Sequence, residues 1–567
     1  MERNYISMRS YIGNRILFKT NELENLWNCT TKTVNRRLKK YQDKKLLVFQ
    51  AGIGRGNLSQ IIFSHPFDVE LDEFLNQSLA AKSYDDILFL LELNLPSQWL
   101  NNALEDVRKI FKVHYMNDNL TCLRTILPRP VTTLDPRKAS SALEAFLLQQ
   151  TGDTLLDFDM EKQKITPRLA HHWRQLNFGR TWVLFLRKNV LFHNGKLFNS
   201  EDVLYSIKQA CGPESVICWA LDNIDSMECL DEYSIKICLK KPDSFFLRYL
   251  CSINLTMVPN GYNYPVDQWT GTGAFKLEIK NETPVRLVSF NDYYGIKPLL
   301  DIVEFWNIKK VKLIPEQRAD YSPILLNDGF NFIIFNHKKS PVFNQKEFRE
   351  ALYHLLDSKQ MFTELKRPYN NKIKSYFQTQ EKHIPLEDSK IENLLKACDY
   401  NNEPLTLGFM MSDEYSEEAK WIQQKANKYG LRLELMAIDK NEYLSSNLAE
   451  SKIDIMLAGE IPSEDIQLSF LQFLFSPVLL PKRFFSDNIY NEINEHLAEE
   501  NNDPETISPN DNLYRLDDFL FSNYYIIYLN QMKHEQMIYP FINEDVTSSY
   551  GYMDLKNTWF IDEAQYR

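Results

Sequence analysis

The chain has 567 residues, of which 44% are hydrophobic and 25% charged, a composition typical of folded globular protein that argues against disorder. It carries 65 Lys and Arg against 76 Asp and Glu, a formal net charge of −11. The first 66 residues hold twelve basic and four acidic side chains, so a small head of net charge +8 precedes a body of net charge −19. This split predicts a head that binds a polyanion, and it argues against a globular enzyme with a single purpose.

The sequence offers no segment suited to crossing a membrane. Its most apolar run covers residues 87–95, far short of the about 20 residues that a membrane helix needs. Its start has no apolar stretch of signal-peptide length. We therefore expect a cytoplasmic protein without membrane contact. The eight cysteines include no CxxC pair, so we expect reduced thiols, no metal site and no cofactor.

The basic head begins with two short amphipathic helices. In the first, apolar residues recur at helical spacing, at Tyr5, Met8, Tyr11 and Ile12. The second is expected to start with Thr20 as its cap and with Glu22 in its first turn, where the helix dipole favours an anion. Its apolar face is expected to consist of Leu23, Leu26 and Trp27.

A third helix, over residues 31–42, is the most informative part of the head. Val34, Leu38 and Tyr41 lie at helical spacing and are expected to face the core. The outward polar side chains are the candidate DNA contacts: Lys32, Thr33, Asn35, Arg36, Lys39 and Lys40. Twelve helical residues span about 18 Å, and the major groove, about 12 Å wide, accepts such a helix. Its hydroxyl, amide and guanidinium groups suit base edges, and its lysines suit phosphates.

Two apolar runs flank a glycine-rich turn after this helix. Residues 46–49 and 61–63 are expected to be strands and residues 52–57 the turn between them, which together form a wing. Arg55 at the tip is placed to contact a phosphate or to enter a minor groove. These patterns predict a winged helix-turn-helix over residues 1–66 that binds double-stranded DNA. The alternatives are a basic face that is merely solvated and a winged helix that docks on another protein.

Residues 67–118 are expected to form a helical connector. Ser83 suits the cap of one helix, and Pro96 suits the first position of another. The second helix carries an apolar stripe made by Leu100, Leu104, Val107 and Phe111. Such a helix either packs on the body or pairs two chains. A homodimer stays open because helix-turn-helix proteins usually bind two half-sites.

The body, residues 119–567, alternates strands and helices without a catalytic signature. It contains no GxSxG, HExxH, Rossmann or P-loop motif, so we do not expect an enzyme. The histidines His171, His172 and His193 lie near aromatic residues, and we expect them to be hydrogen-bonded structural groups rather than metal ligands. The residues alone indicate a large α/β body and state no function for it.

Ordered motifs in the body resemble those of family 5 solute-binding proteins, which include the oligopeptide-, dipeptide- and nickel-binding proteins of ABC importers. Residues 165–173 (ITPRLAHHW) resemble the family's P-x-L-A-x-x-W stretch, and residues 182–195 (WVLFLRKNVLFHNG) resemble its F-x-L-R-x-x-V-x-F-H-x-G stretch. Residues 271–276 (GTGAFK) resemble G-T-G-P-Y, with Ala in place of Pro. Further similar segments are residues 134–136, 202–203 and 291–298.

This resemblance implies two α/β lobes that close on a ligand by a hinge motion. Residues 403–445 are expected to form a strand, a helix and a strand of the second lobe. The whole chain is similar to SgrR-type regulators, in which a winged helix precedes a solute-binding domain. The implied fold class is mixed α/β: a winged helix-turn-helix, a helical connector and a two-lobed domain of the periplasmic-binding-protein type over residues 119–567. The implied function is a transcription regulator that senses a small solute such as a sugar, a sugar phosphate or a peptide-like molecule.

The resemblance also places the ligand, with one departure from the family. Its G-W-x-x-D segment, whose Asp binds the amino terminus of a peptide, falls on residues 459–463, where neither the Trp nor the Asp is present. The candidate ligand residues are Thr272, in a Gly-Thr-Gly loop expected to let the chain bend between lobes, and Glu460, Ser463 and Glu464. Asp465 is a further substitute for the missing Asp. A free peptide is therefore not the only ligand to expect, and a polar uncharged or basic solute is an equal alternative. The alternatives are an importer's binding protein with an incidental basic extension, and a cleft that binds nothing.

Overall fold

The computed structural model of the chain describes most of its residues. The described ranges are 2–13, 17–52, 58–81, 113–115, 120–127, 130–265, 268–279, 285–307, 322–367, 371–377, 388–439, 442–443, 452–463, 465–498, 509–538 and 553–558, with single positions between 86 and 99. The chain divides into two compact units, and each is described by itself. The first unit comprises residues 1–130, 278–287 and 300–319, and the second comprises residues 131–277, 288–299 and 320–567.

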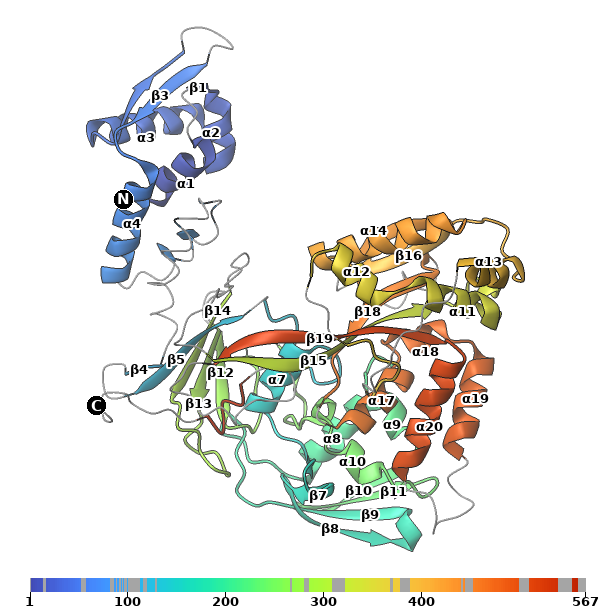
Figure 1. Ribbon diagram of the computed structural model, residues 1–567. Helices are drawn as coiled ribbons and strands as arrows, with labels where there is room; N and C mark the ends of the chain where they lie inside the picture. The colour runs from blue at the N-terminus through green and yellow to red at the C-terminus, as the bar shows by residue number, and fades with distance from the viewer. Residues whose placement is uncertain are drawn as a thin grey trace. The chain divides into compact units, whose positions relative to one another are not determined.

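The head in the first unit has the element order of a winged helix-turn-helix (Figure 1). Its elements are α1 (Arg3–Ile12), β1 (Leu17–Phe18), α2 (Thr20–Trp27), α3 (Thr31–Asp43), β2 (Leu47–Gln50) and β3 (Ser59–Phe63). The strands form an antiparallel sheet in the order β1-β3-β2. The predicted fold of the head is thus present, and the turn between β2 and β3 at residues 53–57, which includes Arg55, lies outside the described residues.

The core of the head follows the predicted periodicity, with two corrections. Tyr5, Met8 and Ile12 of α1 are buried, but Tyr11 is 48% exposed because it lies on the flank of the buried side, about 100° around the helix from Ile12. The cap of α2 is also different from the prediction. Thr20 is its first helical residue, and the cap is Lys19, whose backbone N–H donates to Glu22 Oε1 over 2.8 Å.

A buried polar cluster fastens helix α4 (Phe67–Ala80) to α1. Glu70 is 1% exposed and accepts hydrogen bonds from Tyr5 Oη over 2.6 Å and from Arg9 Nε over 3.0 Å. Burial raises the pKa of Glu70, although both hydrogen bonds oppose this shift. The helix directly after Pro66 is therefore packed on the head. The predicted cap Ser83 and the apolar stripe after Pro96 lie outside the described residues.

A five-stranded sheet has the strand order β12-β13-β14-β5-β4. Its strands are β4 (Val113–Tyr115), β5 (Thr121–Leu127), β12 (Phe275–Ile279), β13 (Val285–Ser289) and β14 (Ile302–Asn307). Strands β14 and β5 are parallel, and Arg124 Nε of β5 donates to Glu304 Oε2 of β14 over 2.8 Å. This buried ion pair joins two strands that are 180 residues apart in the sequence.

The first lobe of the second unit is built around the antiparallel sheet β10-β11-β9-β8. Its elements are α7 (Ala142–Thr151), the hairpin β6 (Leu156–Asp159) and β7 (Lys164–Pro167), β8 (Ala170–Leu176), η1 (Asn177–Gly179), β9 (Thr181–Leu186), α8 (Ser200–Ala210), α9 (Cys218–Leu221), β10 (Ile224–Asp231), β11 (Ser234–Leu239), α10 (Phe246–Tyr249) and η2 (Ile253–Leu255). Helix α8 is capped by Asn199, whose side chain accepts from the backbone N–H of Asp202, and not by Ser200. Its apolar face packs into a core that includes Val203, Ile207 and Phe192.

The second lobe contains the mixed sheet β17-β16-β18-β15-β19. Its strands are β15 (Ser322–Phe335), β16 (Leu405–Met410), β17 (Leu433–Ile438), β18 (Ile455–Glu460) and β19 (Ile526–Ile538). Its helices are η4 (Pro341–Asn344), α11 (Lys346–Leu355), α12 (Ser358–Glu364), α13 (Asp388–Lys396), α14 (Asp413–Lys428), α17 (Ile466–Phe475), α18 (Leu480–Phe484), α19 (Asp487–Ala498) and α20 (Pro509–Ser522). Helices α19 and α20 lie side by side (Figure 1). The predicted strand, helix and strand of residues 403–445 are β16, α14 and β17, with the two strands parallel.

The Gly-Thr-Gly segment has a different role from the bend that its sequence suggested. Neither Gly271 nor Gly273 has a positive φ. Both pass directly over the end of α7, where a Cβ on Gly273 would lie 2.4 Å from the carbonyl carbon of Thr151 and 2.5 Å from the backbone nitrogen of Gly152. The glycines are therefore required because two backbone segments approach closely, and not because the chain turns sharply.

We predict that Gly273→Ala lowers the free energy of unfolding by about 3 kcal/mol or prevents folding, because backbone must move to admit the methyl group. Gly195→Ala is the matched control. Gly195 has a φ of +85°, and a Cβ added there would have no heavy atom within 4 Å, so this change costs only the left-handed backbone strain, about 1 kcal/mol. Chemical denaturation of both variants measures the difference, and equal losses would contradict the close-approach explanation.

Candidate functional site

The outer face of α3 presents three basic side chains. Because an α-helix turns about 100° per residue, the buried Val34, Leu38 and Tyr41 define one side of α3. Lys32, Arg36 and Lys39 lie on the opposite side and are exposed. Among the described residues, no acidic side chain forms an ion pair with any of these three. The sequence placed all three among the DNA contacts, and the structure brings them together on one face.

Other predicted DNA contacts lie at the edges of this face. Asn35 is exposed, whereas Thr33 is half-buried and its hydroxyl lies 3.3 Å from that of Thr30. Lys40 Nζ forms an ion pair of 2.5 Å with Glu2 Oε1, and Lys44 Nζ lies 3.2 Å from the same oxygen. The hydrogen bond from Lys40 is the main reason that the pKa of Glu2 is lowered. Lys40 therefore contributes less unbalanced charge than Lys39 does.

Arg37 is a structural residue of α3 that the sequence analysis did not single out. Its guanidinium lies over the Trp27 ring, 5.3 Å from the ring centroid, and its side chain is half-buried. This contact joins α3 to α2 and fixes the angle between the two helices of the motif. A sequence signal was available, since Arg37 lies three residues after Val34, on the flank of the buried side.

The second unit contains a cavity of about 180 Å³ between elements of its two lobes. From the first lobe, its walls come from α7, the β6–β7 hairpin and the segment around η2; from the second lobe, they come from the end of β18 and from α17. Of the four ligand candidates predicted from sequence, Glu460 and Ser463 line this cavity. Thr272 does not, and Glu464 lies outside the described residues.

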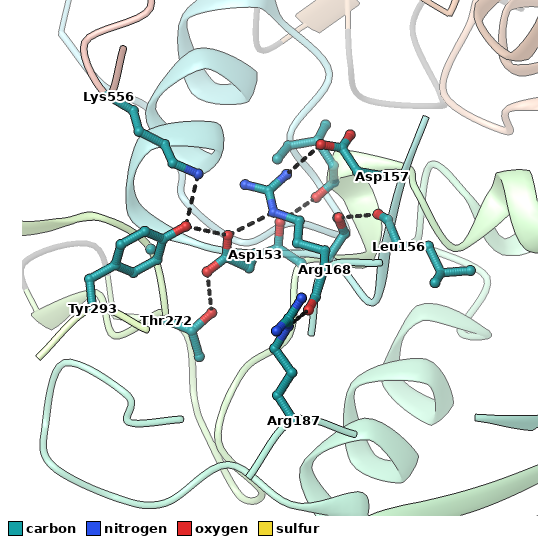
Figure 2. A network of polar contacts seen from close by, with 12 residues as sticks. Asp153, Leu156, Asp157, Arg168, Arg187, Thr272, Tyr293 and Lys556 are labelled. Carbon is teal, nitrogen blue, oxygen red and sulfur yellow. Dashed lines mark hydrogen bonds and ion pairs between the residues drawn. The ribbon is translucent and has the colours of Figure 1, made fainter. Parts of the chain in front are cut away.

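A polar network in the first lobe explains the position of Thr272 (Figure 2). The fully buried Asp153 accepts hydrogen bonds from Arg168 Nε over 2.7 Å and from Thr272 Oγ1 over 3.0 Å. Tyr293 Oη lies 3.5 Å from Asp153 and accepts a hydrogen bond of 2.9 Å from Lys556 Nζ. Thr272 thus holds Asp153, and Arg168 passes from this network to the cavity wall. The sequence analysis quoted Arg168 within a family motif and assigned it no role.

The acidic residue Asp465 in the second-lobe wall of the cavity is already paired with an arginine. Asp465, proposed from sequence as a substitute anchor, forms two contacts of 2.5 Å with Arg248 Nε and Nη2. Its Oδ1 also caps α17 by accepting from the backbone N–H of Leu468 over 3.0 Å. Ser463 Oγ lies 2.6 Å from Ser469 Oγ. The Asp465 carboxylate is therefore already paired with Arg248, and the Ser463 hydroxyl with that of Ser469. Neither side chain is free to replace the Asp that binds the ligand in the family.

Glu460 is the carboxyl group of the cavity without a basic partner among the described residues. It is the last residue of β18, and its Oε1 accepts a hydrogen bond from Tyr376 Oη over 3.5 Å. Burial raises the pKa of Glu460 to about 7, and the hydrogen bond from Tyr376 opposes this shift only partly. Near neutral pH this carboxyl group therefore exists in both protonation states.

The histidines do not form a catalytic or metal site in the described part of the chain. The Nε2 atom of His193 lies 2.9 Å from the Gly273 carbonyl oxygen, and burial lowers the pKa of His193 to about 4. His171 and His172 are exposed on β8. Over the described ranges, no group of three or more His, Cys, Asp and Glu side chains is arranged to hold a metal ion. No helix described here has the length and apolar character required to span a membrane.

Comparison with known families matches both parts of the chain. Residues 2–109 match the family model of the sugar transport-related sRNA regulator N-terminus, SgrR_N. Residues 164–319 match the middle region of the bacterial extracellular solute-binding proteins of family 5. The head and the body of the chain are thus each similar to a known family.

Transcription regulators are among the proteins similar to this chain. The HTH-type transcriptional regulator SgrR of Pectobacterium atrosepticum is 24% identical over 344 residues, which cover 57% of this chain and 58% of that protein. The SgrR of Yersinia enterocolitica is 23% identical over 349 residues, covering 59% and 60%. The alignments thus span about three-fifths of these SgrR-type relatives. An uncharacterized protein of Bacillus subtilis, YhjP, is 24% identical over 484 residues, 79% of each chain.

Solved structures show that the body of this chain has the fold of periplasmic binding proteins. The binding protein DppA from Helicobacter pylori, in complex with the peptide STSA, superposes with a TM-score of 0.67 at 18% identity, over 80% of this chain and 100% of DppA. The binding protein AgaA from A. tumefaciens R10, in complex with agropinic acid, gives a TM-score of 0.65 at 18% identity, over 78% and 99%. The expected two-lobed fold is confirmed.

We predict that replacing the Glu460 carboxyl group stabilises the protein at alkaline pH. Because the folded-state pKa of about 7 exceeds the ordinary value, the wild type loses stability as the pH rises from about 4.5 through 7. Glu460→Gln removes this loss, so it should be more stable than the wild type by about 2 kcal/mol at pH ~8 and by much less at pH ~5. Thermal unfolding across this range measures the difference.

Glu434→Gln is the control for this prediction, because Glu434 is an exposed carboxylate on β17 of the same sheet. Asp517 and Glu418 are also buried and have pKa values raised to about 7 by burial. Their contribution is the same in all three proteins and cancels in the comparison. Parallel pH profiles of the wild type and Glu460→Gln would show that Glu460 is not an uncompensated buried acid.

Proposed function

We propose that this chain is a DNA-binding transcription regulator whose solute-binding domain senses a small molecule and alters operator binding. The observation that carries the proposal is the outer face of α3, where Lys32, Arg36 and Lys39 are exposed and without acidic partners among the described residues. A basic face on the third helix of a winged helix-turn-helix is suited to the major groove. The names of the SgrR relatives support the same function.

The geometry of α3 distributes the DNA contacts. Its 13 residues correspond to a rod of about 20 Å, long enough to lie in the groove with its N-terminal half against the bases. Arg36, near the middle of the exposed face, suits a bidentate contact with a guanine. Lys39, one turn further on, suits a phosphate.

The sensing step of the proposal depends on the body. Two lobes with a polar cavity between their elements provide a site at which a solute would favour the closed arrangement. A solute alters the DNA affinity only if it binds one conformation better than the other. A coupling free energy of about 1–3 kcal/mol would change operator affinity about 5- to 150-fold.

The proposed function also implies a cytoplasmic location, a dimeric assembly and a role other than catalysis. A protein that acts on the bacterial genome works in the cytoplasm, and a dimer would match the two half-sites that helix-turn-helix proteins usually bind. One matched family is described as solute-binding proteins and the other as a regulator N-terminus, which supports a non-enzymatic role. The second candidate, a solute-binding protein of an ABC importer with an incidental basic extension, is favoured by the periplasmic relatives of the body. The ordered winged helix of the head favours the regulator.

We predict that Arg36→Ala weakens specific operator binding by about 1–3 kcal/mol and relaxes base preference at one position of each half-site. Operator titration with the full chain and with single-base operator variants measures both effects. Arg37→Lys is the comparison, since Arg37 supports Trp27 rather than the DNA-facing side. An Arg36→Ala protein with unchanged affinity and base preference would contradict a direct base contact.

We predict a difference between two adjacent lysines of α3. Lys39→Ala should weaken binding to all DNA sequences alike and reduce the slope of log affinity against log salt by about 1, because one phosphate contact is lost. Lys40→Ala should change the slope less, because Lys40 is already paired with Glu2. Fluorescence anisotropy over a salt series compares the two variants, and equal slopes would contradict the assignment of free charge to Lys39.

A further inference from the structure

The basic groups at the cavity are already engaged by acidic partners. Arg168, in the first-lobe wall, donates to Asp153 over 2.7 Å and lies 3.9 Å from Asp157. Arg248 contacts both oxygens of Asp465 and donates from Nη1 to Gln467 Oε1 over 2.6 Å. Figure 2 shows the Arg168 guanidinium directed toward Asp153 and Asp157. The charge of each guanidinium is therefore balanced by carboxylates of the protein, and Arg248 in addition has three of its nitrogen atoms engaged.

The acceptor groups of the cavity are, in contrast, incompletely satisfied. Glu460 has the single hydrogen bond from Tyr376 and no cation within ion-pair distance among the described residues. Ser476 Oγ is fully buried in the wall and has no hydrogen-bond partner in the described structure. The Oε1 atom of Gln149, also in the wall, is buried without a partner. Buried polar atoms are normally paired, so Ser476 Oγ and Gln149 Oε1 indicate a missing partner in the cavity that Glu460 also lines.

The charge balance of the wall points the same way. Asp157, Glu460 and Asp465 line the cavity together with one cation, Arg168. Even with Arg248 behind Asp465, the three carboxylates outnumber the two guanidinium groups. A partly buried carboxylate without a counter-charge is destabilised by desolvation, and an ammonium or guanidinium group from a solute would reduce that cost. A phosphate group would instead add negative charge to an acidic wall.

We infer that the cavity binds a small basic solute, whose ammonium or guanidinium group donates to Glu460, Gln149 and Ser476, and that it rejects phosphorylated solutes. The inference rests on the proposed sensing function and specifies the chemical class of its ligand. A volume of about 180 Å³ equals that of roughly six bulk water molecules at about 30 Å³ each. A monosaccharide-sized amine or a short diamine is the scale of molecule that fits.

The test measures thermal stabilisation of the full chain by matched probes at a pH of about 7.5, where Glu460 is largely ionised. The probes are putrescine, agmatine and glucosamine as basic solutes, 1,4-butanediol and glucose as neutral counterparts, and glucose 6-phosphate as the phosphorylated counterpart. We expect a basic probe to raise the unfolding midpoint and its counterparts to leave it unchanged. Stabilisation by glucose or glucose 6-phosphate at equal or lower concentration, or by no basic probe at millimolar concentration, overturns the inference.

Two variants connect the effect to the cavity. Glu460→Gln should weaken binding of the basic probe about tenfold to a hundredfold, the equivalent of one charge-assisted hydrogen bond, and Ser476→Ala should weaken it several-fold. Glu434→Gln, which removes an exposed carboxylate of the same sheet, should bind like the wild type. Undiminished binding by both cavity variants overturns the assignment to this site.

An operator-binding assay on the same preparations separates this inference from the proposed function. If the protein binds operator DNA but no basic probe, only the inferred ligand class is wrong. If the protein binds a basic probe through Glu460 but shows no preference for duplex DNA, the inferred ligand class stands and the proposed regulatory function is wrong.

Discussion

The carboxylate of Asp153 joins four segments of the body that are distant in sequence. It accepts from Arg168 and Thr272, and Tyr293 connects it to Lys556 near the end of the chain. Because Asp153 is fully buried, its charge must be compensated, and this requirement fixes the position of each partner. The Gly-Thr-Gly loop, the wall residue Arg168 and the C-terminal segment all take their places from it. Removal of a partner would leave a buried charge exposed to an apolar environment, which is strongly unfavourable.

Buried charges in the head are also compensated by partners, whereas three basic side chains on the surface of α3 have no acidic partner among the described residues. Inside the head, Glu70 is buried and paired with Arg9 and Tyr5, and this contact fastens α4 to α1. On the outside, α3 keeps three basic side chains that no described acid compensates. A cation in water needs no partner, so such a face costs little stability and remains available for a phosphate backbone. Charged side chains that are paired inside the head are therefore structural, and the basic side chains of α3 that lack a described acidic partner are available for binding.

In the body, this distinction identifies the site. Arg168 and Arg248 are structural because their carboxylate partners are within hydrogen-bonding distance. Glu460 differs from both, since burial raises its pKa to about 7 and only Tyr376 donates to it. A regulator that senses a solute requires a group whose free energy changes when the solute binds. A carboxyl group with too few partners, such as Glu460, meets this requirement. The chemistry of the wall therefore relates the fold of a binding protein to a specific class of ligand.

The sequence by itself determined the winged helix, the strand–helix–strand of residues 403–445 and the buried side of α3, since helical spacing, glycine turns and net charge are local properties. It also selected Glu460 and Ser463 as ligand candidates through their place in a family segment, and both line the cavity. It did not reveal that Lys40 is paired with Glu2, that Thr272 holds Asp153, or that Asp465 is bound by Arg248 from 217 residues away. These pairings depend on which distant segments meet in the folded chain. Only the tertiary structure decided which charges are compensated, because compensation is a matter of distances across the fold and not of spacing along it.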